Sequence, residues 1–492
     1  MGAAFFAGYY LRHQDPLFSS GSLATRVAQV GGKRDTFTGF SGILSPVTPA
    51  SSDILHTATA AVENVAPAEA NELSVKRARR KFDTIYNLVR QYYVDKLPGN
   101  RQMSYSAIRT MLSSLNDPHC YFLEPEQYAL LEAEAQGTYP GIGASLSIRP
   151  IKRDGYTEYK IVVISALPGS PAAQAGLRPG DIITHVNGRW VLGFNPYLSV
   201  NKLARKIQAS EATDAEENQY RNELESARKK EAGGIGLLAA QLALRGDSLT
   251  RAKLKLPTDN QKLTISRPGV KEPLVVEMAS RRTDVPKVAA RKLPTGEGYL
   301  QIPVFTRKTG EEVRAALKSL PTDKGLVLDL RGNPGGTLEA TLEVESLLLA
   351  ETGGGIFAHQ VVFNGKSVPL KARPASGKRR PVAILIDRGT ASVAEALAVS
   401  LAEKGGAKTV GSRTFGDAIL QAAYTLPDGA AFVIPTGKML SPQKRLSWAN
   451  SGVQPQIAVA PGTAEPKVLA QAAAALGGRP RVAVKQTGSG SE

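Results

Sequence analysis

Strand and helix patterns alternate through the last third of the chain, and this alternation restricts the fold more than any other feature. Apolar runs of strand length lie at 298–304, 325–330 and 382–386, and helical spacing follows at 310–320, 338–349 and 392–402. The run 325–330 is apolar except for Asp329, which is typical of a buried strand. We therefore predict an α/β layer with a mostly parallel sheet.

Composition sets outer limits on function. The chain has 492 residues, 42% of them hydrophobic and 21% charged, which suits a soluble globular protein of two to four domains. The net charge of +17 comes from scattered Lys and Arg, and only 6% of residues are aromatic, so nucleic-acid binding is not predicted. Cys120 is the single cysteine and the five histidines show no paired ligand spacing, so we predict neither an intrachain disulfide nor a metal site.

The first 136 residues divide into three parts. Residues 2–11 form an apolar run too short to span a bilayer and without a basic segment before it. It is either the remnant of a signal or anchor segment or simply a buried or disordered N-terminus. Residues 13–72 are rich in Ser, Thr, Ala, Gly and Pro and predict a poorly ordered spacer, after which helical spacing begins.

A second β-rich region precedes the alternating one. Strand patterns lie at 144–148, 159–164, 262–266 and 274–277. The string from Ala166 to Gly188 has a Ser-Pro-Ala-Ala helix start, a glycine stop and a Pro-Gly-Asp turn. Residues 208–232 are strongly charged and predict a solvated helix.

Two turns of the alternating region carry candidate chemistry. The strand 325–330 leads into Asn-Pro-Gly-Gly, which brings the N–H groups of Gly335 and Gly336 to the carboxyl end of the sheet. Ser392 follows another strand and begins a helix, so its hydroxyl and the N–H of Val393 face the same space. Taken alone, such a serine is more often a helix N-cap than a nucleophile.

The order of these strings resembles the carboxyl-terminal processing peptidases over about residues 80–460. The string 166–188 resembles a bacterial PDZ domain, and it is followed by D-L-R-x-N-P-G-G, G-T-A-S-x-A-E and T-F-G-D-A-I-L-Q. The resemblance implies a multidomain α+β protein: a helical region, a PDZ β-sandwich or barrel with an insertion, and an α/β peptidase core with ClpP/crotonase-like sheet layers. The implied segments are an N-terminal anchor remnant or spacer 1–72, a helical region 73–136, a PDZ domain 137–285 with insertion 196–256, a serine peptidase core 286–465 and a tail 466–492.

Roles for individual residues follow from the same resemblance. Ser392 would be the acyl nucleophile, with Glu395 and Gln421 as supporting polar groups. The N–H of Val393 and that of Gly335 or Gly336 would stabilise the oxyanion. In the PDZ domain, the loop of Gly141, Ile142 and Gly143 would hold the carboxylate of a bound peptide tail.

One position departs from the family. The lysine that serves as general base there is replaced by Asp417, a weak base with a shorter side chain. His119, in an Asp-Pro-His string, is one substitute, as in the related tricorn-type peptidases; a cation such as Lys438 or Lys408 is another. Two functions therefore stay open: a serine endopeptidase with altered base chemistry, or a pseudopeptidase that binds peptide tails.

The resemblance also implies partners and location. The partners would be the C-termini of proteins and peptides, without a cofactor. An extracytoplasmic protein of the periplasm or cell envelope is implied, and a membrane anchor is left open. The sequence leaves open whether the chain forms a homo-oligomer or pairs with an active paralogue.

Overall fold

The computed structural model divides the chain into two units, Met1–Val47 and Thr48–Glu492, and the residues that it describes belong to the second. They are 69–153, 156–209, 211–349, 355–362, 365–374, 380–460 and 462–477. The predicted anchor remnant and most of the predicted spacer lie outside them. Among the described residues, no helix combines the length and the apolarity that crossing a bilayer requires.

The first described segment is helical, as predicted. Its elements are α4 (Glu69–Tyr92), α5 (Asn100–Ser113), β1 (Tyr121–Leu123) and α6 (Pro125–Ala135). Helix α6 begins sharply because Pro125 occupies its first turn and Glu124 and Gln127 form a capping box. Strand β1 pairs with β19 (Ala431–Leu440), so this segment is hydrogen-bonded to the C-terminal part of the chain.

The next segment is a seven-stranded sheet. Its strands are β3 (Ala144–Arg153), β4 (Tyr156–Ala166), β5 (Ile182–Val186), β6 (Arg189–Leu192), β7 (Gly234–Gly236), β8 (Asn260–Ser266) and β9 (Leu274–Ala279). Strand β3 pairs with β4 and lies at one end of the strand order, so its other edge is available for a further strand. The Pro-Gly-Asp turn predicted after the short helix α7 (Pro171–Gln174) precedes β5.

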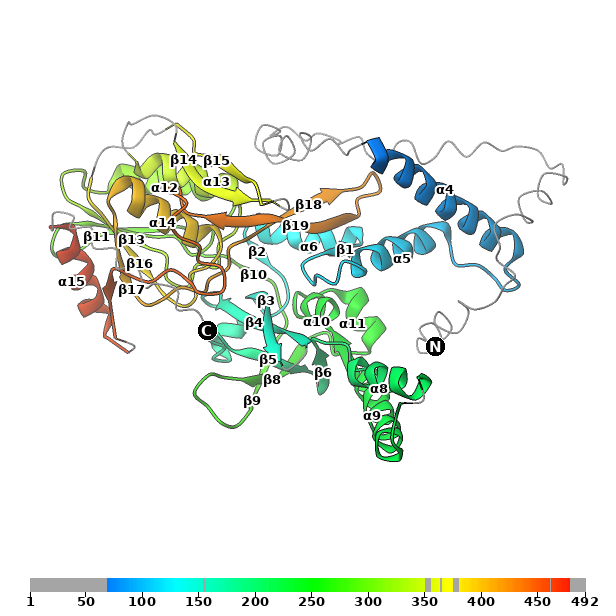
Figure 1. Cartoon of the computed structure of the whole chain (residues 1–492). Helices are drawn as coiled ribbons and strands as arrows, with labels where there is room; N and C mark the ends of the chain where they lie inside the picture. Colours follow the sequence, from blue (N-terminus) through cyan, green and yellow to red (C-terminus); the bar gives the residue numbers. More distant parts are fainter. Residues whose placement is uncertain are drawn as a thin grey trace. The chain divides into compact units, whose positions relative to one another are not determined.

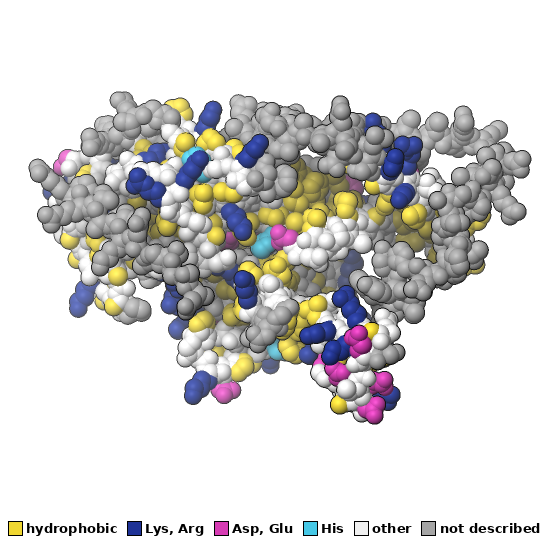
Figure 2. All heavy atoms as spheres, viewed as in Figure 1, with side chains coloured by type: hydrophobic (Ala, Val, Ile, Leu, Met, Phe, Trp, Pro, Cys, Tyr) yellow, Lys and Arg dark blue, Asp and Glu magenta, His cyan; other side chains and the backbone are white. Residues whose placement is uncertain are grey.

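Four helices lie between β6 and β8. They are α8 (Leu198–Gln208), α9 (Asp214–Gly233), α10 (Leu237–Leu244) and α11 (Ser248–Leu254). Helix α9 is the predicted charged helix, and Figure 2 shows acidic and basic side chains mixed at the α8–α9 end of this face. Helix α10 differs, because Ala240, Ala243 and Leu244 are buried in the hydrophobic core of the sheet.

The C-terminal part contains the predicted mostly parallel sheet. Its order is β11 (Ala289–Lys292), β12 (Gly298–Gln301), β13 (Leu326–Asp329), β16 (Val382–Ile386), β17 (Lys408–Gly411) and β20 (Ile457–Ala458). All neighbouring pairs are parallel except β11 with β12. The prediction of an α/β layer is confirmed, and so is the multidomain α+β class.

Helices cover both faces of this sheet (Figure 1). Leu326 and Leu328 of β13 pack with residues of α13 (Leu338–Leu348) and α14 (Val393–Gly405), whereas Val327 packs with α15 (Glu465–Leu476) on the opposite face. Both faces are buried, which explains why the central strands are mostly apolar. Helix α12 (Thr309–Ser319) packs against α13.

A second sheet lies beside this layer. Its strands are β1, β19, β14 (Ile356–Val361) and β15 (Ser367–Lys371), with β18 (Ile419–Thr425) paired to β19. Strand β18 follows directly after Asp417 and carries Gln421. The parallel sheet therefore supplies the turn of Ser392, and the second sheet supplies β18, which begins two residues after Asp417.

Candidate active site

Ser392 occupies a sharp turn between β16 and α14. Its backbone has φ +56° and ψ −126°, a conformation that side-chain-bearing residues rarely adopt and that costs of order 1–3 kcal/mol. Its N–H donates to Glu395 Oε2 over 2.9 Å. The N–H of Val393, at the first position of α14, has no acceptor among the described residues, as expected for a helix start.

The loop that follows β13 lies against this turn. We call Leu330–Gly336 the donor loop. A methyl group on Gly335 would lie 2.9 Å from Ser392 Cβ, so glycine is required for this close approach, and φ of +101° favours glycine too. The N–H of Gly335 donates to Asn333 Oδ1 over 2.8 Å. Gly336 is exposed and its N–H has no acceptor within the described ranges, so Gly336 is the one of the two predicted donors with a free N–H.

Asn333, which is fully buried, joins the donor loop to its surroundings. Its Nδ2 donates to Ile302 O over 2.8 Å, and its carbonyl accepts the N–H of Ala391 over 2.9 Å. Ala391 is the residue directly before Ser392. The backbone bond from Ala391 to Asn333 thus ties the serine turn to the donor loop.

Glu395 connects the serine turn to the segment that contains Asp417. Its Oε1 accepts the hydroxyl of Thr414 and the N–H of Gly416, and its Oε2 accepts the N–H groups of Ser392 and Asp417. The last two bonds are 2.9 and 2.8 Å, so the backbone nitrogens of Ser392 and Asp417 flank one oxygen atom. Burial raises the pKa of Glu395 to about 8, although the hydrogen bonds from Thr414, Gly416 and Asp417 oppose this rise.

This raised pKa predicts that stability falls as pH rises toward 9. Between the ordinary pKa of 4.5 and about 8, the folded chain holds a proton on Glu395 that the unfolded chain has released. The stabilisation is therefore complete below pH 4.5 and is lost as pH rises through 8, which amounts to a few kcal/mol. Thermal unfolding followed between pH 6 and 9 measures it.

Thr414→Val is the matched variant. The hydrogen bond from Thr414 lowers the pKa of Glu395. The variant lacks this bond, so the pKa should rise further and stability should be lost at higher pH. Stability that increases with pH in the wild type, or an unchanged pH dependence in the variant, would contradict the protonation of Glu395.

Asp417 itself lies at a contact with the PDZ-like sheet. Its Oδ2 accepts the hydroxyl of Ser147 over 3.3 Å, and its Oδ1 accepts the N–H of Ile419 over 3.3 Å. The backbone of Asp417 is therefore next to Ser392, whereas its carboxylate hydrogen-bonds strand β3. No hydrogen bond joins the Asp417 carboxylate to Ser392 in the part of the chain that the structure describes.

Arg149, two residues after Ser147 on β3, extends the same contact. Its guanidinium lies 4.1 Å from the ring centroid of Phe415 and donates to Phe415 O and to Asn450 Oδ1. Burial lowers the pKa of Arg149, and the charges of Asp417 and Glu395 oppose that shift. Asp417 therefore lies in the field of a cation from the PDZ-like sheet.

His119 and Gln421 lie close to each other. Gln421 Nε2 donates to the carbonyl of His119 over 3.2 Å. The His119 ring is half-buried, and its Nδ1 pairs with Asp117 Oδ1 over 2.8 Å. Lys438 is an exposed residue of β19 opposite Ile419, and Lys408 begins β17; within the described ranges neither hydrogen-bonds Ser392.

The predicted carboxylate loop in the PDZ-like sheet is partly occupied by the chain itself. The N–H of Ile142 donates to Leu244 O, at the end of α10, over 3.0 Å. A methyl group on Gly141 would lie 2.0 Å from the same oxygen, which requires glycine there. Gly143 is buried beside Ser170 and directly precedes β3. Of the three predicted N–H donors, that of Ile142 is already used.

Several residues at the site were not singled out from the sequence. Thr414 and Asn333 lie within the strings T-F-G-D-A-I-L-Q and D-L-R-x-N-P-G-G, but nothing in those strings marks them out. Only their contacts with Glu395 and with the residue before Ser392 indicate a role. Ser147 and Arg149 carry no local signal at all. No cluster of three or more His, Cys, Asp or Glu side chains suited to a metal occurs in the described ranges.

Comparisons with known proteins identify two matching domain families and several similar proteases. Residues 296–459 match the family model of peptidase family S41, and residues 162–216 match that of a PDZ domain. The carboxyl-terminal-processing protease of Synechocystis is 28% identical over 72% of this chain and 71% of its own length. The carboxy-terminal processing protease CtpA of Bacillus subtilis is 28% identical over 77% of this chain and 68% of its own length.

A solved structure shares the fold. The photosystem II D1 C-terminal processing protease superposes with a TM-score of 0.52 and 23% identity, over 80% of this chain and 91% of that one. Other similar proteins are named as bacterial or chloroplastic processing enzymes. The chain therefore matches a PDZ domain and peptidase family S41 in this order, and it is similar to carboxyl-terminal processing proteases over about 70% of their length.

Proposed function

We propose that this protein is a serine endopeptidase that captures C-terminal tails and cleaves through an acyl-Ser392 intermediate. The observation that carries this proposal is the backbone of Ser392. Its strained conformation sets the serine against Gly335 of the donor loop. The adjacent N–H groups of Val393 and Gly336 have no acceptor among the described residues. Strain of this kind persists where the surrounding structure enforces it, and it is concentrated at active sites.

The chemistry is acyl transfer. Ser392 Oγ attacks the scissile carbonyl while a base takes its proton, and the two N–H groups donate to the oxyanion. The base then protonates the leaving amine, which departs as the C–N bond breaks. Water repeats the sequence on the acyl-enzyme and releases the new carboxyl terminus.

For the base we propose His119. Its Nδ1–H donates to Asp117 Oδ1 over 2.8 Å, which leaves Nε2 as the proton acceptor of a neutral imidazole. The bond from Gln421 to its carbonyl holds His119 beside the segment that carries Asp417. Catalytic hydrogen bonds are often long without substrate and shorten when it binds. The bond between His119 Nε2 and Ser392 Oγ would form in this way.

Peptides or proteins are the substrate class that the PDZ and peptidase domains indicate. We propose that a tail adds as a strand to the free edge of β3. Its carboxylate would be held by the N–H groups that follow Ile142, because that of Ile142 donates to Leu244. We also propose an extracytoplasmic location, which the chloroplastic and bacterial processing enzymes among its relatives support.

A second candidate function is a peptide-binding pseudopeptidase. It is favoured by the hydrogen bond between Ser147 and Asp417, because the carboxylate in the position of the lysine holds the PDZ strand and, among the described residues, makes no hydrogen bond to Ser392. In this reading the tail is bound and released uncleaved.

A fluorophosphonate probe separates the two functions. We expect the full-length protein to be labelled at Ser392 and a tail peptide to be cleaved, whereas Ser392→Ala should bind the same peptide without labelling or cleavage. Mass spectrometry identifies the labelled residue. A wild type that binds the peptide, resists the probe and leaves the peptide intact would exclude the endopeptidase and support the binding module.

A further inference from the structure

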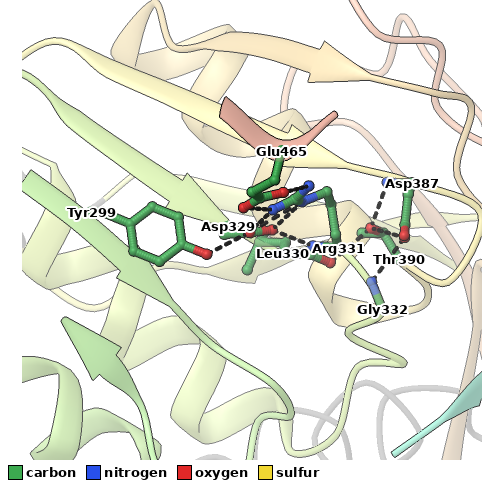
Figure 3. Close-up of polar contacts among 8 residues, drawn as sticks. All are labelled: Tyr299, Asp329, Leu330, Arg331, Gly332, Asp387, Thr390 and Glu465. Carbon is green, nitrogen blue, oxygen red and sulfur yellow. Dashed lines mark hydrogen bonds and ion pairs between the residues drawn. The ribbon is translucent and has the colours of Figure 1, made fainter. Parts of the chain in front are cut away.

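A buried carboxylate ends strand β13, directly before the donor loop. Asp329 is fully buried, and it accepts the hydroxyl of Tyr299 over 2.7 Å and both the N–H and the Nε of Arg331 over 2.9 Å (Figure 3). A buried charge is tolerated only when it is paired and hydrogen-bonded. Arg331 is therefore required to neutralise the buried Asp329 carboxylate.

Arg331 has a second acidic partner, Glu465, on the opposite side. Its Nη1 donates to Glu465 Oε2 over 2.8 Å and its Nη2 to Glu465 Oε1 over 3.0 Å. This is the two-pronged geometry that fits a guanidinium to a carboxylate and restricts its orientation. The hydrogen bond from Arg331 holds the pKa of Glu465 below its ordinary value. Glu465 is the first residue of α15, a helix that packs on the face of the sheet opposite α14.

The backbone that follows Arg331 leads directly to the serine turn. Gly332 N–H donates to Asp387 Oδ1 over 2.8 Å, and Thr390 Oγ1 donates to Leu330 O over 2.8 Å. Figure 3 shows these contacts beside the Arg331 cluster. Four residues further on is Gly336, whose N–H is free. Arg331 donates to Asp329 Oδ1 through both its backbone N–H and its Nε, so its side chain and the start of the donor loop share one anchor.

The two partners of Arg331 differ in burial. Asp329 is inaccessible, and losing its pairing would leave a buried charge. The Glu465 side chain is 49% exposed, so replacing it leaves no buried charge without a partner, while Arg331 keeps its bonds to Asp329. Glu465 is thus free to act on the orientation of Arg331 without being required for folding.

We propose that Glu465 is a positioning residue for the proposed acyl transfer: it fixes Arg331 and thereby holds the donor loop, with the Gly336 N–H, against Ser392. This inference rests on the proposed function. Helix α15 would thus contribute to the site although it lies on the other face of the sheet.

Glu465→Gln tests the proposal, with Glu311→Gln as its matched control. Glu311 is also an exposed glutamate in the first turn of a helix, α12, but it does not contact the donor loop. We expect Glu465→Gln to slow fluorophosphonate labelling and kcat about 10-fold, with KM, tail-peptide binding and thermal unfolding unchanged, because small displacements of catalytic groups have large effects on rate. Glu311→Gln should match the wild type. Equal rates in both variants would overturn the proposal, and so would a loss of rate that parallels a loss of stability.

Arg331→Lys gives a second test. It keeps a cation for Asp329 but loses the two-pronged bond to Glu465. If both residues act through one contact, adding Glu465→Gln to Arg331→Lys should not slow labelling further. Additive losses would show that Glu465 acts by another route.

Hydrogen exchange keeps this inference separate from the proposed function. A wild type that the probe does not label would refute the endopeptidase, but the backbone amides of residues 331–333 and 335–337 still report on the donor loop. Faster exchange there in Glu465→Gln than in Glu311→Gln supports the positioning role, and equal exchange in both overturns it.

Discussion

His119→Gln is expected to lower kcat for a tail peptide by about 10³-fold, within the range that general bases contribute. Glutamine has a similar size and retains a hydrogen-bonding group, but it cannot take a proton from Ser392 at neutral pH. The backbone carbonyl of residue 119 would still accept from Gln421, so the local fold should be kept. Steady-state cleavage and equilibrium binding of the same peptide measure the two effects, and the Kd should change less than twofold, an order-of-magnitude expectation for a group outside the PDZ groove.

His185→Gln is the control for this experiment. His185 is a half-buried histidine of β5, whose ring lies 5.9 Å from that of Trp190 in the PDZ domain, away from the serine turn. Its replacement should leave kcat unchanged. If His119→Gln cleaves as fast as the wild type, His119 is structural and the Asp117 pair serves only the loop that contains it.

Much of the fold follows from sequence because the relevant signals are local. The runs 325–330, apart from Asp329, and 382–386 are apolar because α13 and α14 cover one face of the sheet and α15 covers the other. The charged run 208–232 contains α9, which has few apolar residues to bury and is exposed along most of its length. Helix α10 is different, because its Ala and Leu residues would suit either a buried or an exposed helix. Only the structure shows that this helix packs into the core of the PDZ sheet. The exact domain boundaries stay a prediction.

The site was less accessible to sequence reasoning, because its decisive contacts connect distant segments. The strings around Ser392 and Gly336 indicated a serine turn and N–H donors, and the geometry places both together. The choice between Gly335 and Gly336 depended on Asn333 Oδ1, which occupies the N–H of Gly335. The contact of Asp417 with Ser147 spans 270 residues, and no periodicity or motif could indicate it.

This contact determines what a lysine at position 417 would meet. The backbone nitrogens of Ser392 and residue 417 flank Glu395 Oε2, so a lysine side chain from this position starts next to the nucleophile. Arg149 lies nearby, where it interacts with the charge of Asp417. A neighbouring cation disfavours the charged amine and lowers its pKa, which is the change that a catalytic lysine requires. The arrangement therefore retains the surroundings of a lysine base although the lysine is absent.

Asp417→Lys, introduced into His119→Gln, is accordingly expected to restore cleavage at least 100-fold, as a regained general base should. The restored activity should rise with pH, because only the deprotonated amine of the new lysine can act as a base. Removing Arg149 in addition should shift this rise to higher pH, because the amine would lose the neighbouring cation that lowers its pKa.

The matched control is Asp417→Asn in the same background, which removes the negative charge without adding an amine. Equal recovery with asparagine would mean that the charge of Asp417 inhibits the site, and no recovery with lysine would mean that the serine turn cannot use a base from this side. Activity that appears with lysine in an otherwise inactive wild-type chain would instead identify the native protein as the peptide-binding module, in which Asp417 replaced catalysis by a contact to the PDZ strand.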